Sequence, residues 1–233
     1  MKKPISIICV GLLMITLAGC SNQIAEVKAN TASNNDQQKI ETKDSSQDYG
    51  TTRQLLEVSS KNTKIYYPKL QGYKGELSMD YMNQSIKQLA ESFAKAADYT
   101  DVQLDYEVKR IDDKVVSILF KGTGKLSGSR EINIQKSVNL DVKSTNPIAY
   151  ENFIKKDERS RAEVIKLLNV KAKNSGIAKG FQAEGVFLYF EGDYVVFFYM
   201  PLDDDAKAWV ELSVPLSELD GLINTEFGEH PAS

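Results

Sequence analysis

The sequence predicts an α+β fold that is mainly an antiparallel sheet, with two main helices and a short C-terminal helix. Alternation of apolar and polar residues with a period of two, which is typical of strands, recurs within residues 102–142 and again in 208–214. Apolar residues at helical spacing mark two longer segments, 78–97 and 157–173. Strands and helices do not alternate strictly and no internal repeat is visible, which favours α+β over a parallel α/β arrangement.

The first strand and the first helix are predicted from short local signals. Residues 65–67, Ile-Tyr-Tyr, form a short strand that Pro68 stops, because proline has no backbone N–H to donate. Ser78 fits the N-cap of a helix that runs to about residue 97. The apolar stripe of this helix recurs at intervals of four, three and four residues: Met82, Ile86, Leu89 and Phe93.

Three strands and the second helix follow. Residues 102–108 alternate, Asp112-Asp113 predicts a turn, and residues 116–120 carry the inward face of the next strand. The segment 131–142 alternates most clearly, with an apolar face broken only by a lysine and a polar face opposite. Such alternation predicts an antiparallel sheet with one solvated face. The helix 157–173 comes next and buries valine, isoleucine and leucine.

The C-terminal part has a different pattern. Residues 186–190 and 194–200 are apolar on both faces, and Glu191-Gly192-Asp193 predicts a hairpin turn between them. Strands that are apolar on both faces are central and covered on both sides. The segment 208–214 is a last strand, and residues 215–219 predict a short helix that begins after proline.

The N-terminus has the features of a secretory signal peptide. Lys2 and Lys3 precede an apolar run, residues 5–17, which is too short to span a bilayer comfortably. Small residues then lead to Cys20 in Leu17-Ala18-Gly19-Cys20, which resembles the lipobox of bacterial lipoproteins. The resemblance implies that residues 1–19 are removed, that Cys20 is lipidated, and that the protein is anchored on the extracytoplasmic face of the cell membrane.

A polar stretch separates the signal peptide from the expected domain. Residues 20–61 include 33–39 and 43–48, which have no apolar periodicity, so we expect a disordered tether. Residues 51–58 contain three apolar residues and are expected to be a marginal helical lead-in. The folded α+β domain is then expected to span residues 62–224.

Composition excludes some function classes. Removing residues 1–19 takes away Lys2 and Lys3, so 27 basic and 32 acidic residues remain and the formal net charge moves from −3 to −5. A nucleic-acid partner is not expected, because nucleic-acid binding needs a basic patch. Cys9 lies in the removed segment and Cys20 carries lipid, so no intrachain disulfide is expected in the mature chain.

Several short motifs resemble a bacterial extracytoplasmic domain found in lysozyme-sensing anti-sigma factors and ahead of some peptidoglycan deacetylase domains. They are Tyr66-Tyr67-Pro68-Lys69-Leu70-Gln71-Gly72 before a helix that contains Asn83, then residues 186–190, and then Val214-Pro215-Leu216-Ser217-Glu218-Leu219. Residues 150–154 match more loosely. The resemblance implies a stand-alone sensory or binding module of the cell envelope.

Two segments depart from that family. Residues 126–130 have no histidine where the family commonly has a Gly-Gly-x-His turn, and residues 203–207 replace a loop that contains tyrosine and glycine. The family's ligand specificity is therefore not carried over to this chain.

No motif specifies a reaction. The only histidine, His230, lies in the polar tail 225–233, where it is badly placed for a catalytic triad. Residues 122–125, Gly-Thr-Gly-Lys, lack the spacing of a phosphate-binding loop and precede a strand. We therefore expect no cofactor, no metal and no catalytic residue, although the many carboxylates leave open a carboxylate-dependent wall hydrolase.

A few residues are candidates for ligand binding. Asp203 and Asp205 fit part of a calcium loop, but a solvated hairpin tip explains them as well. Trp209 falls on the polar face of its strand, where it either anchors a partner or covers the sheet beside a loop. Tyr66 and Tyr67 are further candidates, although tyrosine is also common in strands.

The sequence therefore predicts a non-enzymatic, lipid-anchored binding or sensing module for an envelope ligand, either a peptidoglycan glycan or a lysozyme-like protein. A basic lysozyme-like partner is compatible with the acidic mature chain. Two alternatives remain open: the carboxylate-dependent hydrolase, and a chaperone-like or structural envelope module that would expose an apolar patch.

Overall fold

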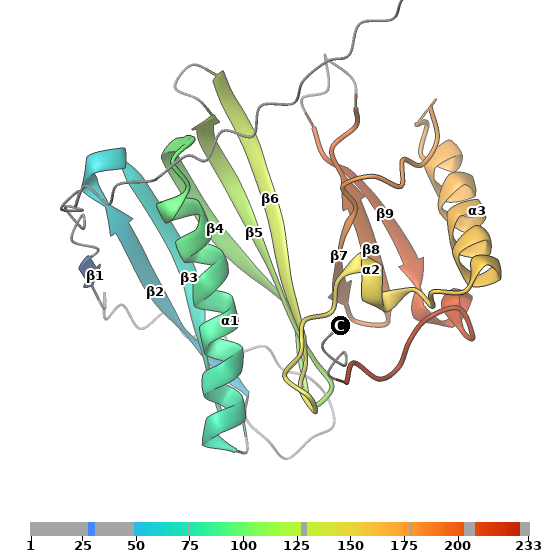
Figure 1. The fold of residues 1–233 in the computed structure, drawn as a ribbon, viewed down its shortest axis with the longest axis horizontal. Helices are drawn as coiled ribbons and strands as arrows, with labels where there is room; N and C mark the ends of the chain where they lie inside the picture. The colour runs from blue at the N-terminus through green and yellow to red at the C-terminus, as the bar shows by residue number, and fades with distance from the viewer. Residues whose placement is uncertain are drawn as a thin grey trace, which may run out of the picture.

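The computed structural model describes residues 28–30, 49–73, 75–126, 130–177, 179–202 and 208–228. It confirms the α+β class: a six-stranded sheet and a three-stranded sheet lie beside each other, each with helices on one side (Figure 1). Within these ranges, no helix is long and apolar enough to cross a membrane.

The large sheet holds the N-terminal half of the described chain. Its strands follow the chain order β1 (Lys28–Asn30), β2 (Gly50–Val58), β3 (Thr63–Gln71), β4 (Tyr99–Ile111), β5 (Val115–Leu126) and β6 (Arg130–Asp141). Neighbours are antiparallel except β3 and β4, which are parallel. A parallel pair needs a crossover connection, and helix α1 (Glu76–Lys95) provides it.

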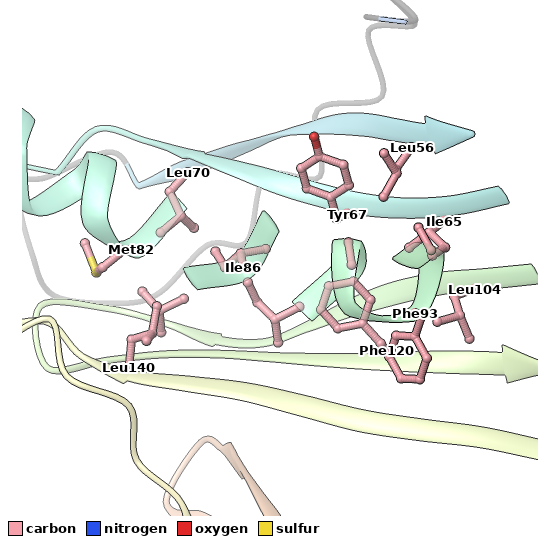
Figure 2. Packing of buried hydrophobic residues seen from close by; sticks show 14 of the residues in the cluster. Leu56, Ile65, Tyr67, Leu70, Met82, Ile86, Phe93, Leu104, Phe120 and Leu140 are labelled. Carbon is pink, nitrogen blue, oxygen red and sulfur yellow. The ribbon is translucent and has the colours of Figure 1, made fainter. Parts of the chain in front are cut away.

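Helix α1 packs against one face of the large sheet. Its predicted apolar stripe packs on the sheet: Met82 and Ile86 are fully inaccessible, Phe93 is buried and Leu89 is partly buried. Figure 2 shows the core side chains that α1 and strands β2 to β6 pack together, among them Leu56, Ile65, Ile86 and Phe120. The predicted N-cap at Ser78 is wrong, because the helix begins two residues earlier, after Gly75. Gly75 has φ 90°, a conformation that glycine adopts readily.

The predicted tether extends too far, and the helical lead-in is wrong. Residues 50–58 form strand β2, which pairs with β3 along its whole length from Gly50↔Gln71 to Val58↔Thr63. Leu56 is 1% exposed in the same core. The folded part therefore includes residues before 62, and a short helical turn, η1 (Ser59–Lys61), connects β2 to β3. A short apolar run does not distinguish helix from strand until its pairing partner is known.

Pro68 does not end β3, contrary to the prediction. Strand β3 continues to Gln71, while its pairing with β4 is limited to Lys64↔Gln103 and Ile65↔Leu104. Pro68 and Leu70 are two residues apart, so their backbone polar groups face the same edge. On that edge Asn83 of α1 accepts a hydrogen bond from the Leu70 N–H (2.7 Å) and donates one to the Leu70 carbonyl (3.3 Å). Proline is tolerated there because β4 does not bond to that part of β3.

The small sheet holds the C-terminal half. Helices α2 (Tyr150–Phe153) and α3 (Glu158–Asn174) precede β7 (Phe187–Glu191), β8 (Tyr194–Tyr199) and β9 (Val210–Pro215), which pair in that order, and the short helix η2 (Leu216–Leu219) follows. Asp157 caps α3 by accepting a hydrogen bond from the Ser160 N–H. The prediction that both apolar segments form central strands covered on both sides is confirmed for β8: Phe197 packs with the α2–α3 core, and Phe198 packs with Leu119 of β5. It is wrong in part for β7, which is an edge strand of the small sheet.

One face of β6 differs from its prediction. The polar face of residues 131–142 was expected to be solvated, but Gln135 and Asn139 are only 6% and 4% exposed. The small sheet covers them, and Asn139 donates hydrogen bonds to the carbonyls of Leu188 and Ile148. Buried polar side chains need such partners, so polar alternation here marks an internal junction between sheets.

Candidate functional site

Four side chains from β2, β3 and β4 form a cluster, one of which, Tyr106, is partly buried against the core under α1. This Arg53 cluster consists of Arg53 on β2, Tyr66 on β3, and Asp105 and Tyr106 on β4. The Arg53 guanidinium carbon lies 3.9 Å from the Tyr66 ring centroid and 5.6 Å from that of Tyr106. A guanidinium nitrogen donates to the Asp105 carboxylate at 2.7 Å. Cation–π stacking and the ion pair hold this side chain in one orientation.

The Arg53 guanidinium stays protonated, and the charged side chains of the Arg53 cluster are partly exposed to solvent. Burial tends to lower the pKa of Arg53, but the hydrogen bond to Asp105 and its charge outweigh this and raise it. Burial also raises the pKa of Tyr106. The Asp105 side chain is 57% exposed and that of Arg53 35%. The cluster therefore presents a carboxylate and a guanidinium that is stacked on the Tyr66 ring, and these groups can bind a polar or charged partner by contact.

A second group of charged residues lies where the two sheets meet. Lys121 of β5 lies 3.4 Å from Glu211 of β9 and 3.9 Å from Glu107 of β4. Lys109 of β4 pairs with Glu107 (2.8 Å) and with Glu191 of β7 (3.2 Å). These ion pairs connect β4 and β5 to both edge strands of the small sheet.

Glu211 is the most constrained carboxylate of this junction. Gln135 donates to it at 2.6 Å and the Tyr189 hydroxyl at 3.2 Å. Burial tends to raise the pKa of Glu211, but the Gln135 hydrogen bond and the Lys121 charge outweigh it and lower the pKa. Burial, together with the Glu211 charge, raises the pKa of Tyr189. Glu211 is thus held ionised and Tyr189 protonated.

This geometry bears on the hydrolase alternative. Because Lys121 contacts both carboxylates, Glu107 and Glu211 are at most about 7 Å apart, within the separation that glycosidases use. A glycosidase also needs one carboxyl whose pKa is raised so that it can act as an acid. The lowered pKa of Glu211 does not suit that acid role, although it is compatible with the ionised nucleophile or base of such a pair.

Side chains of the large sheet form hydrogen bonds with the backbone of β7 along the edge that is not paired with β8. Ser137 and Asn139 of β6 both donate to the Leu188 carbonyl, at 2.6 and 2.8 Å. The Ser117 hydroxyl of β5 accepts from the Phe190 N–H at 2.9 Å and donates to Asn139 at 2.7 Å. The two sheets are therefore joined by side-chain hydrogen bonds and do not form one continuous backbone hydrogen-bond ladder.

The structure separates the residues predicted to bind a ligand. Trp209 packs against Phe187 and Phe198 at the junction, and its indole N–H donates to the Asn133 carbonyl at 3.2 Å. It covers the sheet, which was the alternative given for it. Tyr66 belongs to the Arg53 cluster, whereas its neighbour, the predicted candidate Tyr67, is 7% exposed and packs on the α1 side, away from any solvent-facing ligand. The predictions for Cys20, Asp203 and Asp205 lie outside the described residues.

Sequence reasoning missed Arg53 and Asp105. Arg53 lies in the segment assigned to the tether, so no strand face was considered for it. Asp105 was read as one of several solvated residues of an alternating strand. The signal is weak: Leu56, Glu57 and Val58 alternate, but Leu55 and Gln54 break the pattern, so the face of Arg53 becomes evident only when β2 is recognised as a strand. Within the described part of the chain, no group of acidic, histidine or cysteine residues could hold a metal ion.

Solved structures share this fold. A member of the DUF3298 family from Bacteroides fragilis is similar with a TM-score of 0.50 and 11% identity, over 77% of this chain and 94% of that chain. A DUF3298 family protein from Pseudomonas aeruginosa has the same score and identity, over 78% of this chain and 96% of that chain. No protein-family model and no curated protein matches the sequence. At this identity the similarity shows the fold alone: the chain has the fold of DUF3298 family proteins.

Proposed function

We propose that this protein is a lipid-anchored, extracytoplasmic module that binds a cell-envelope ligand without transforming it. The anchor would be Cys20, and the ligand a peptidoglycan glycan or a basic, lysozyme-like protein. The proposal rests on the lipobox-like N-terminus and on the surface that carries the Arg53 cluster.

One structural observation carries the binding part of the proposal. Helix α1 packs on one side of the large sheet, and the small sheet contacts β4, β5 and β6. The outer face of β2 and β3 lies away from both, and there the Arg53 cluster presents polar and aromatic groups held in place by ion pairing and stacking. A rigid, pre-arranged polar and aromatic surface favours recognition because little ordering entropy is lost on binding.

Binding is tested by calorimetry of the full chain with purified peptidoglycan fragments and, separately, with lysozyme. We expect Asp105→Asn to weaken lysozyme binding about tenfold, roughly 1.4 kcal/mol, because a charge facing a basic partner is lost. Tyr66→Ala should weaken glycan binding, because an aromatic contact is removed. Asp80→Asn, an exposed carboxylate on α1, is the control and should change neither affinity. Absence of binding to both ligands would contradict the proposal.

The same preparations test the hydrolase alternative. The alternative requires release of soluble muropeptides from the wall and loss of this activity in Glu211→Gln. A binding module releases none.

The anchor is tested separately with Cys20→Ala. We expect the substituted protein to remain uncleaved or to leave the membrane fraction, because two acyl chains at about 0.8 kcal/mol per methylene make attachment persistent. A substituted protein that is still processed and labelled by radioactive fatty acid would refute the assignment.

A further inference from the structure

A row of cations runs along the exposed side of α3. Arg159, Lys166 and Lys173 are seven residues apart and all three are exposed. With a rise of 1.5 Å per residue, their Cα atoms are spaced by about 10.5 Å along one line of the helix. The opposite side of α3 is buried through Val164 and Leu168. We call these three residues the α3 cation row; Figure 1 places helix α3 itself on the far side of the small sheet from β1–β3.

The cations of this row have fewer carboxylate partners than the lysines of α1. On α1, Lys87 and Lys95 both pair with Glu91, at 3.4 and 2.7 Å. On α3, none of the described carboxylates lies within 4.0 Å of the cationic groups of Arg159 or Lys173. Two helices of the same protein thus differ: one exposed face is neutralised internally, and the other is left positive.

The position of the arginines is unfavourable for the helix itself. Arg159 and Arg161 lie in the first turn, where the positive end of the helix dipole repels cations. Only a weak pair at 3.9 Å, between Lys166 and Glu163, reduces the charge of the row. Residues 155–179 hold eight basic and three acidic residues, a formal charge of +5 in a chain whose net charge is −3. Residues that oppose local stability in this way are expected at functional surfaces.

We propose that the α3 cation row binds a linear, phosphate-bearing polyanion of the envelope; its location in the envelope rests on the proposed function. The charges lie along a line, which a narrow polymer can follow. A flat anionic bilayer would also approach the acidic residues beside the row, such as Glu158 and Glu163. It would meet the chain that follows α3 as well, because residues 180–233 hold eleven acidic residues and one basic residue. Charge complementarity therefore favours the polymer over the bilayer.

The experiment titrates the full chain carrying Cys20→Ala with inorganic polyphosphate at several salt concentrations. The test variant replaces three cations: Arg159→Gln, Lys166→Gln and Lys173→Gln. The control variant removes the same charge from the large-sheet half: Lys64→Gln, Lys87→Gln and Lys95→Gln. We expect the test variant to bind at least tenfold more weakly, with a slope of log K against log salt that is smaller by about 2. The control variant should stay within about threefold of the original chain.

Three outcomes would overturn the proposal. They are no binding of polyphosphate by the original chain, equal weakening in the test and control variants, and binding of phosphatidylglycerol vesicles as tight as that of polyphosphate. Circular dichroism checks that α3 is intact, and Arg159→Lys, which keeps the charge, should bind like the original chain. Lysozyme and peptidoglycan binding should be unchanged in the test variant, so failure here is distinguishable from failure of the proposed function.

Discussion

The hydrogen bonds of Asn83 to the edge of β3 lead to a specific stability prediction. Asn83→Ala leaves the N–H of Leu70 without its 2.7 Å acceptor, and Leu70 is fully buried. An orphaned buried N–H costs about 1–3 kcal/mol, and the second, 3.3 Å bond adds up to about 1 kcal/mol. Alanine returns about 0.6 kcal/mol through its higher helix propensity. We therefore expect a net loss of about 2 kcal/mol in the free energy of unfolding.

The assay is urea unfolding followed by fluorescence of Trp209, the only tryptophan of the chain, and by circular dichroism. Gln84→Ala, at the exposed neighbouring position, controls for helix propensity and should be neutral or slightly stabilising. If the free energies of unfolding of Asn83→Ala and Gln84→Ala differ by less than about 0.5 kcal/mol, the Asn83 side chain does not take the place of a paired strand at the edge of β3.

A second substitution separates the two hydrogen bonds. Asn83→Asp keeps the acceptor for the Leu70 N–H but places a carboxylate oxygen against the Leu70 carbonyl. The pKa of that carboxyl would be raised in the folded state, so its stability should recover as pH falls and the carboxyl gains a proton. Equal instability of Asn83→Asp at all pH values would contradict this account.

Three further predictions concern the large sheet and the junction. A Cβ at Gly122 would lie 1.9 Å from the Gln103 carbonyl oxygen, so Gly122→Ala should cost at least about 2 kcal/mol in thermal unfolding. Gly50→Ala should not lower the stability, because a Cβ there would meet open space. Equal melting temperatures of the two variants would contradict the close approach of Gly122 to the Gln103 carbonyl. The lowered pKa of Glu211 contributes stability above its unfolded value of 4.5 that is lost as pH falls through the folded pKa. Glu211→Gln should therefore be less sensitive to acid, and an unchanged pH profile would contradict this. Trp209→Phe removes the indole hydrogen bond and should cost about 1 kcal/mol in urea unfolding; a variant as stable as the original chain would remove that role.

Local signals were sufficient for the approximate extents of the two main helices and for the central strand of the small sheet. The predicted helix 157–173 forms α3, and the doubly apolar segment 194–200 forms β8 between two covered faces. In both cases the signal lies within a few residues. The hydrogen bonds of a helix join residues that are close in sequence, and a strand that is buried on both faces is apolar at nearly every position.

The wrong predictions concern features that depend on which distant part of the chain packs against a segment. Strand β2 depends on pairing with β3, and the Arg53 cluster depends on bringing β2 beside β4. The polar face with Gln135 and Asn139 was read as solvated, although β7 covers it. Alternation reveals which face is polar, but the partner that covers that face comes from more than 40 residues away.

The two cores are each built from one continuous stretch of the chain. Among the described residues, the buried core under α1 comes from Tyr49 to Leu140, and the core under α3 from Ile148 to Leu219. A chain that emerges from its N-terminus can therefore complete the first core before the second is available, and domains generally fold as such units. The contacts between the two sheets, which include the ion pairs of Glu191 and Glu211, the hydrogen bonds to β7 and the packing of Trp209, must wait for both. Each core can therefore form from contacts within its own half of the chain, and the contacts between distant segments at the junction form last.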